Sequence, residues 1–132
     1  MKIKKDFIIV TRHPTPTELL ENLVQIVPEF LSAWNSEDNL FIDKDGSFSG
    51  HGVFTEFSSF IRGNFGLLDE NRRKKLFDYI EECVNTDIHS ENGVSNAARI
   101  CFIENLAGEG ALSNEILKYL GVESKKYFDK WN

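Results

Sequence analysis

The sequence has few of the residues from which metal centres, disulfide frameworks and redox sites are built. It contains two cysteines and three histidines, and none of them shows a paired spacing such as C-x-x-C or H-x-x-x-H. Cys83 and Cys101 are both flanked by apolar residues at helical spacing, which favours buried, reduced thiols in a structural role. We therefore expect no metal site and no cofactor.

Long apolar runs and catalytic sequence motifs are also missing. No apolar run is longer than four or five residues, so we expect no membrane-spanning helix. The N-terminal run Phe7–Val10 is far shorter than the apolar part of a signal peptide and leads into Thr11-Arg12-His13-Pro14, which favours a cytoplasmic protein. Neither a glycine-rich phosphate-binding loop nor a nucleophile-elbow pattern occurs.

Apolar residues are nevertheless plentiful enough for one folded domain spanning residues 1–132. They make up 41% of the chain, and eleven of them are phenylalanine. A chain of this length buries roughly two-thirds of its unfolded surface around a single core. That burial can offset the loss of chain entropy, so the protein is expected to fold.

A capping signal at Thr15 predicts the start of the first helix. Pro16 stands at the first helical position, and Glu18 follows three residues after Thr15, which completes a capping box. Apolar residues then recur at steps of three and four as far as about Asn35. Pro28 interrupts this stripe, so we expect a kink there, or a break after which a second short helix begins.

The same periodicity predicts further helices along the rest of the chain. They cover Val53–Phe65, a segment capped by Asp69 and ending near Val84, a central helix over Val94–Ala107 that is apolar on all sides, a segment capped by Ser113 and closed by Gly121, and a last one carrying Tyr127, Phe128 and Trp131. The single strand-like segment is Phe7–Thr11, which we interpret as part of an extended arm over residues 1–14. The prediction is an all-α fold, a compact bundle of about six helices.

Between Asn35 and Gly50 the sequence predicts a long loop. This stretch is rich in turn formers and acids around a small apolar insert, Leu40-Phe41-Ile42. Loops of this length without secondary structure are usually functional.

Negative charge is concentrated in two segments of the chain. The formal net charge is −6, yet residues 13–61 alone carry −7 and residues 81–115 carry −6. If both segments share a face, they form a patch that attracts a basic partner and repels nucleic acid. The alternative is that these acids are simply solvated. The candidate partner-binding residues are Glu37, Asp38, Asp43, Asp45, Glu81, Glu82 and Asp87.

Two stretches could be taken for a calcium site and a catalytic pair, but their residues do not fit either. The Asp43-Lys44-Asp45-Gly46 stretch resembles a calcium loop, but its register would place Phe41 and Gly52 at two of the strongest ligand positions. Cys83 lies near a helix C-terminus, where the dipole opposes a thiolate, so a pairing with His89 for catalysis is disfavoured.

Two further features have structural explanations as well as functional ones. Glu104, in the central helix, needs a partner if it is buried, and Arg99, Tyr79 or a helix N-terminus could supply one. The basic run Arg72–Lys75 is most simply a solvated helix face, and RNA binding through it is the least favoured functional reading.

Several short stretches together resemble a family of small all-helical bacterial proteins. They are V-P-E-F at residues 27–30, H-x-V-F-x-E-F-x-x-F at 51–60, L-F-x-[FY]-I-E at 76–81, F-[IL]-E-N-L at 102–106 and L-G-x-x-S at 120–124. Proteins similar in size and acidity include the immunity proteins of contact-dependent growth inhibition and related polymorphic toxin systems. The resemblance implies a protein that neutralises the C-terminal domain of a cognate toxin, often a basic nuclease such as an RNase.

The leading hypothesis is thus a non-enzymatic immunity protein that covers the active site of a basic toxin domain with carboxylates. The first alternative is a regulatory or scaffolding helical protein that binds a peptide or a second copy of itself. The second is a small enzyme built on Glu104, His51 or His89, which would require a pocket that gathers at least two of these groups.

Overall fold

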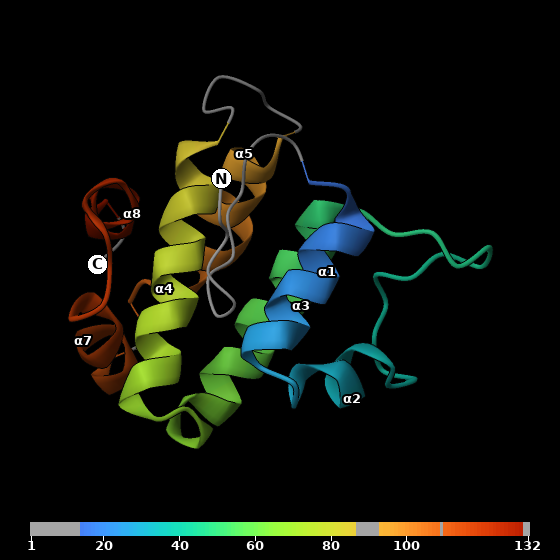
Figure 1. Cartoon of the computed structure of the whole chain (residues 1–132), viewed down its shortest axis with the longest axis horizontal. Helices are drawn as coiled ribbons and strands as arrows, with labels where there is room; N and C mark the ends of the chain where they lie inside the picture. Colours follow the sequence, from blue (N-terminus) through green and yellow to red (C-terminus); the bar gives the residue numbers. More distant parts are fainter. Residues whose placement is uncertain (1–13, 87–92, 109, 131–132) are drawn as a thin grey trace, which may run out of the picture.

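The computed structural model describes residues 14–86, 93–108 and 110–130, and these residues form helices joined by turns and loops, with no strand among them (Figure 1). The predicted all-α class is therefore confirmed. The extended arm predicted for residues 1–14 lies, except for Pro14, outside the described residues.

The helical segments follow one another along the chain as α1 (Pro16–Ile26), α2 (Phe30–Trp34), α3 (Gly50–Asn64), the 3₁₀ turn η1 (Phe65–Leu67), α4 (Glu70–Asn85), α5 (Val94–Ala97), the π-helical segment η2 (Ala98–Ile103), α6 (Glu104–Leu106), α7 (Ala111–Leu117) and α8 (Val122–Asp129). Because α5, η2 and α6 are continuous, they form one rod at the position of the predicted central helix. Counted in this way, the described residues contain seven helices, close to the predicted six.

The capping box predicted at Thr15 is present. The Thr15 hydroxyl accepts a hydrogen bond from the Glu18 N–H at 3.1 Å, and the Glu18 carboxylate accepts one from the Thr15 N–H at 2.8 Å. The break predicted at Pro28 is also present, since α1 ends at Ile26 and α2 begins at Phe30. This break turns α2 across the end of α3 and places the following loop at the edge of the bundle (Figure 1).

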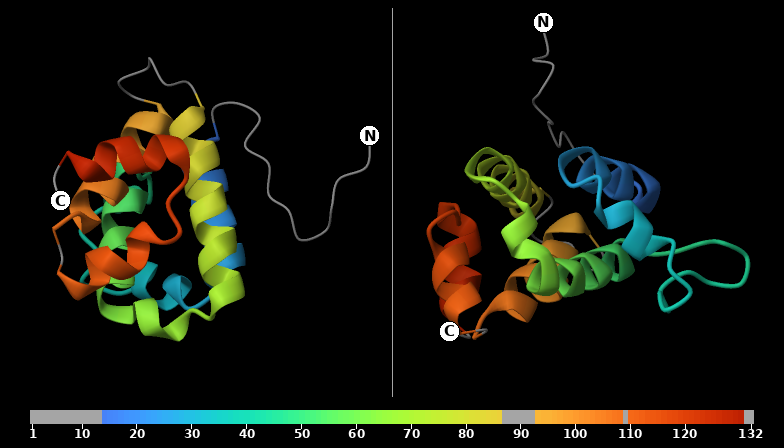
Figure 2. Two further views of the ribbon diagram at one scale, coloured as in Figure 1. Left: turned by 90° about the vertical axis from the view of Figure 1, so that its left-hand side faces the viewer. Right: turned by 90° about the horizontal axis from the view of Figure 1, so that it is seen from below.

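The rod α5–η2–α6 packs against α3, α4 and α8 (Figure 2). Its Phe102 ring is fully buried. The ring centroid lies 5.5 Å from that of Phe57, 5.9 Å from that of Phe54 and 6.1 Å from that of Phe77. Aromatic rings at these distances interact favourably beyond the area they bury. Phe102 thus joins the core faces of α3 and α4.

Two local predictions are wrong. Ser113 does not cap its helix, because α7 already begins at Ala111 and Ser113 is buried within it. Gly121 does not close that helix, because α7 ends at Leu117 and Gly121 is the N-cap residue of α8.

Glu104 is only half-buried. Tyr79, which we considered as its partner, accepts a hydrogen bond from the Asn22 amide at 3.1 Å instead.

Candidate protein-binding surface

The loop of residues 35–49 projects from the bundle between α2 and α3 (Figure 1). It carries four of the candidate residues, Glu37, Asp38, Asp43 and Asp45, and the side chains of all four are exposed. Lys44 is the one basic residue of this segment. The loop is therefore a negatively charged projection, although Phe48 at its end packs on the Trp34 ring, with the two centroids 5.0 Å apart.

Asn39 fastens the first half of this loop to the bundle. Its side chain is 9% exposed, and its amide donates a hydrogen bond of 2.7 Å to the Trp34 carbonyl at the end of α2. The amide oxygen of Asn39 in turn accepts a hydrogen bond of 2.9 Å from the Phe41 N–H. A buried amide with both its ends bonded fixes the path of the backbone on either side of it.

The tip of the loop is a tight turn organised by Asp43 and Ser47. The Asp43 N–H donates to the Ser47 carbonyl at 2.8 Å, and Gly46 adopts a φ of +88°, a conformation that favours glycine. Asp45 accepts hydrogen bonds from the Ser47 hydroxyl and N–H at 2.6 and 2.9 Å, and these bonds lower the pKa of its carboxyl group. The resemblance of this stretch to a calcium loop reflects this turn. Among the described residues no group of three or more potential metal ligands is found.

The negative surface continues from the loop onto α3. The pKa of Glu56 is raised, first by partial burial of its carboxyl group and then by the negative charge of Asp38 nearby. This like-charge proximity could not be read from residues eighteen positions apart in sequence. We define the acidic loop surface as Glu37, Asp38, Asp43, Asp45 and Glu56.

The remaining candidate acids do not join this surface. Glu81 and Glu82 belong to α4, and Glu81 is bonded to the start of α8. The acidic loop and α8 lie on opposite sides of the bundle (Figure 2, right). Glu82 is exposed, and Asp87 is outside the described residues. The seven candidates are thus not one patch, and only the four loop acids are brought together.

Glu81 caps the N-terminus of α8. Its carboxylate accepts hydrogen bonds from the Glu123 N–H at 2.9 Å, the Ser124 N–H at 3.0 Å and the Ser124 hydroxyl at 2.8 Å. Gly121 permits this approach, because a Cβ there would lie 2.4 Å from the Glu81 carboxyl group. Partial burial alone would raise the pKa of Glu81, but these hydrogen bonds outweigh it and the pKa falls below its ordinary value of 4.5.

We predict that Glu81→Gln lowers the free energy of unfolding by about 1–2 kcal/mol at neutral pH, because the charged cap of α8 is lost. Since the folded pKa of Glu81 is depressed, its contribution is present above the unfolded pKa of about 4.5 and is lost as the pH falls through the folded value. Urea unfolding of the wild type and the variant between about pH 7 and about pH 3 checks this. The difference between their free energies of unfolding should shrink below about pH 4.5. Glu82→Gln, on the exposed neighbouring residue, is the control and should change little at any pH; an equal loss in both variants would contradict the cap.

The basic run is engaged with the body of the protein. Arg72 pairs with the Glu29 carboxylate and donates a further hydrogen bond of 3.3 Å to the Ile26 carbonyl at the end of α1. Arg73 lies over the Phe65 ring, 4.0 Å from its centroid, and donates to the Phe65 carbonyl at 3.1 Å. These two side chains join helix ends, so the predicted solvated face is wrong for Arg72 and Arg73, whereas Lys74 is exposed.

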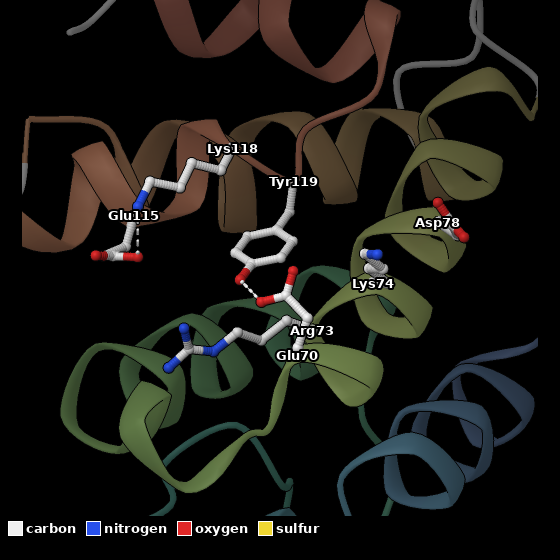
Figure 3. Close-up of a pocket in the computed structure, with 7 residues that line it drawn as sticks. All are labelled: Glu70, Arg73, Lys74, Asp78, Glu115, Lys118 and Tyr119. Carbon is white, nitrogen blue, oxygen red and sulfur yellow. Dashed lines mark hydrogen bonds and ion pairs between the residues drawn. The ribbon is translucent and has the colours of Figure 1, made fainter.

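A groove of about 510 Å³ lies between α4 and α7 (Figure 3). Its lining residues are Glu70, Arg73, Lys74, Asp78, Glu115, Lys118 and Tyr119. Three acids and three bases line it, so it has no net charge. The Tyr119 hydroxyl donates to Glu70 at 2.6 Å, and Lys118 pairs with Glu115 at 3.3 Å. This groove could not be predicted from the sequence, because its two walls are more than thirty positions apart.

The two described residues suggested for catalysis, His51 and Glu104, do not line one hollow. His51 bonds through Nε2 to the Asn96 amide oxygen at 2.7 Å and lines a small hollow of about 90 Å³, to whose lining Glu104 does not belong. His89 lies outside the described residues. Burial raises the pKa of the Cys83 thiol to about 12, which fits the expected structural role of this residue.

Within the described part of the chain, none of the helices is both long and apolar enough to cross a membrane. Comparison with protein families shows that residues 20–132 match a family described as a domain of unknown function (DUF7674). The matched residues include the whole acidic loop surface and the groove. No curated protein and no solved structure matches the chain.

Proposed function

The chain belongs to the DUF7674 family, and we propose that it is an immunity protein that binds the C-terminal domain of a cognate toxin through the acidic loop surface. The toxin domain is expected to be basic, with a cationic active site such as that of an RNase. Binding would cover that site, so inhibition would be steric and electrostatic.

The observation that supports this proposal is the concentration of exposed carboxylates on a projecting loop. Glu37 and Asp38 precede the Asn39 anchor, and Asp43 and Asp45 form the turn at the tip. Like charges held close together repel one another, and the charge of Asp38 adds to the larger effect of burial in raising the pKa of Glu56. A cationic partner would relieve that repulsion on binding.

The physical advantage of such a surface lies in the rate of association. Complementary charges raise association rate constants from about 10⁵–10⁶ M⁻¹ s⁻¹ to about 10⁸ M⁻¹ s⁻¹ or more at low salt. An inhibitor of a toxin must act before the toxin reaches its substrate, so fast capture is useful. We expect the association rate to fall steeply as salt is added.

The test is co-expression with the toxin domain encoded next to this protein. We expect cells that produce both proteins to survive and the two to elute together on a sizing column. Cells that die despite production of this protein, with no complex on the column, would rule out the proposal.

The groove between α4 and α7 favours a second candidate, a regulatory protein that binds a peptide. A groove lined by an aromatic hydroxyl and charges of both signs can pair with the backbone and side chains of an extended segment. Lys118→Glu, at an exposed residue of the groove, separates the two candidates. It should leave toxin binding unchanged if the acidic loop surface is the binding site, and should weaken the binding of a peptide if the groove is the binding site.

A further inference from the structure

The acidic loop carries an apolar segment that the body of the protein does not cover. Leu40 is 86% exposed, Phe41 37% and Ile42 36%. These residues stand between Asp38 and Asp43, so apolar side chains are flanked on both sides by carboxylates. Single exposed apolar residues are common on protein surfaces, so the exposure of Leu40 alone is not informative.

The distinguishing feature is that Leu40 is held in its exposed position from both sides. On one side, Asn39 is buried and bonded to the Trp34 carbonyl at 2.7 Å. On the other, the Phe41 N–H is bonded to Asn39, and the Phe41 side chain packs against α3 at Gly52. A Cβ on Gly52 would lie 2.9 Å from the Phe41 Cβ, so the loop and α3 meet there as closely as glycine permits.

This fixation lowers the entropic cost of using Leu40 in an interface. A flexible loop must be ordered when a partner binds, and immobilising its side chains reduces the free energy gained on binding. Here the Asn39 side chain is already bonded to α2, and the Phe41 side chain already packs on α3. Residues that dominate binding energy are typically apolar or aromatic side chains at the centre of an interface, surrounded by a polar rim.

From this placement we propose that Leu40 is the apolar anchor of the interface, seated in an apolar depression on the toxin domain whose edge carries lysine or arginine. This inference rests on the proposed function. The depression receives Leu40 with Phe41 and Ile42 beside it, and the basic edge meets Glu37, Asp38, Asp43 and Asp45. Charge complementarity identifies the partner as basic, and the exposed Leu40 identifies the centre of the contact.

The two kinds of residue act on different rate constants. Carboxylates at the rim attract the partner from a distance, so they set the association rate and its dependence on salt. The Leu40 side chain has no charge and makes contact only in the formed complex, so it sets the dissociation rate. Salt dependence therefore separates the contribution of Leu40 from that of the acids.

The experiment measures the kinetics of binding to the purified toxin domain encoded next to this protein, at low and high ionic strength. Leu40→Ala is compared with Val122→Ala, which truncates another apolar side chain, 74% exposed, on α8. We expect Leu40→Ala to raise Kd about 10- to 30-fold through faster dissociation, equally at both ionic strengths. Val122→Ala should bind as the wild type does. Thermal unfolding of both variants should match the wild type.

The outcomes distinguish this inference from the proposed function. If the wild type binds but Leu40→Ala dissociates no faster than Val122→Ala, Leu40 is not the anchor, and the immunity function stands. If the wild type does not bind the toxin domain, both the assignment of Leu40 and the proposed immunity function are wrong. An effect of Leu40→Ala that appears in the association rate and changes with salt would also contradict the assignment.

Discussion

Phe102→Ala is expected to lower the free energy of unfolding by about 3–5 kcal/mol. Phe102 is fully buried and contacts the rings of Phe54, Phe57 and Phe77. Its removal leaves a cavity where the central rod meets α3 and α4, and close-packed neighbours refill such a cavity only in part. Because small domains are stable by only about 5–15 kcal/mol, this loss is a large part of the total stability.

Urea unfolding followed by circular dichroism measures this loss. Phe41→Ala is the matched control, since it removes the same atoms from a side chain that is 37% exposed. We expect it to cost about 1 kcal/mol or less. If the two variants lost similar stability, Phe102 would not be at the centre of the core.

Reversing the charges of Glu37 and Asp38 together is expected to weaken toxin binding about 100-fold at low salt, mainly through slower association. Both side chains are exposed, and they precede Asn39, whose amide bonds the loop to the end of α2. Each change to lysine adds two positive units, so the net charge rises from −6 by four units, to −2. The difference from the wild type should shrink at high ionic strength, because salt screens exposed charges.

The control places the same two changes at Glu82 and Asp129, outside the acidic loop. Glu82 belongs to α4 and Asp129 to α8, and both are exposed. The net charge of this variant is identical, so any difference between the two double variants reports position rather than total charge. Stronger loss of binding in the control than in the loop variant would move the interface to α4 and α8.

Much of the fold could be predicted because its signals are local. The capping box at Thr15, the break at Pro28 and the cap at Asp69 each depend on residues within four positions of one another, and the structure confirms all three. The central helix was recognisable from its many apolar residues, but one of them, Ile100, is 46% exposed, so the rod is not covered on all sides as its composition predicted. The start of α7 was missed because Ser113 is a strong capping residue type, and nothing local shows that it is buried.

The candidate site was predictable only in part, because it depends on which distant segments meet. The four loop acids are close in sequence, so their shared surface follows from the turn-rich stretch that holds them. Glu81 resembled them in sequence, but its role depends on α8, which begins 41 positions later at Val122. The proximity of Asp38 to Glu56 and the packing of Phe41 on Gly52 likewise require the folded arrangement.

The most direct test of the acidic loop surface is amide hydrogen exchange of this protein, alone and in complex with the toxin domain. We predict that complex formation slows exchange in residues 35–49 and at the adjoining start of α3, while α7 and α8 exchange as they do in the free protein. Protection confined to α7, α8 and the groove, with residues 35–49 unchanged, would contradict the assignment.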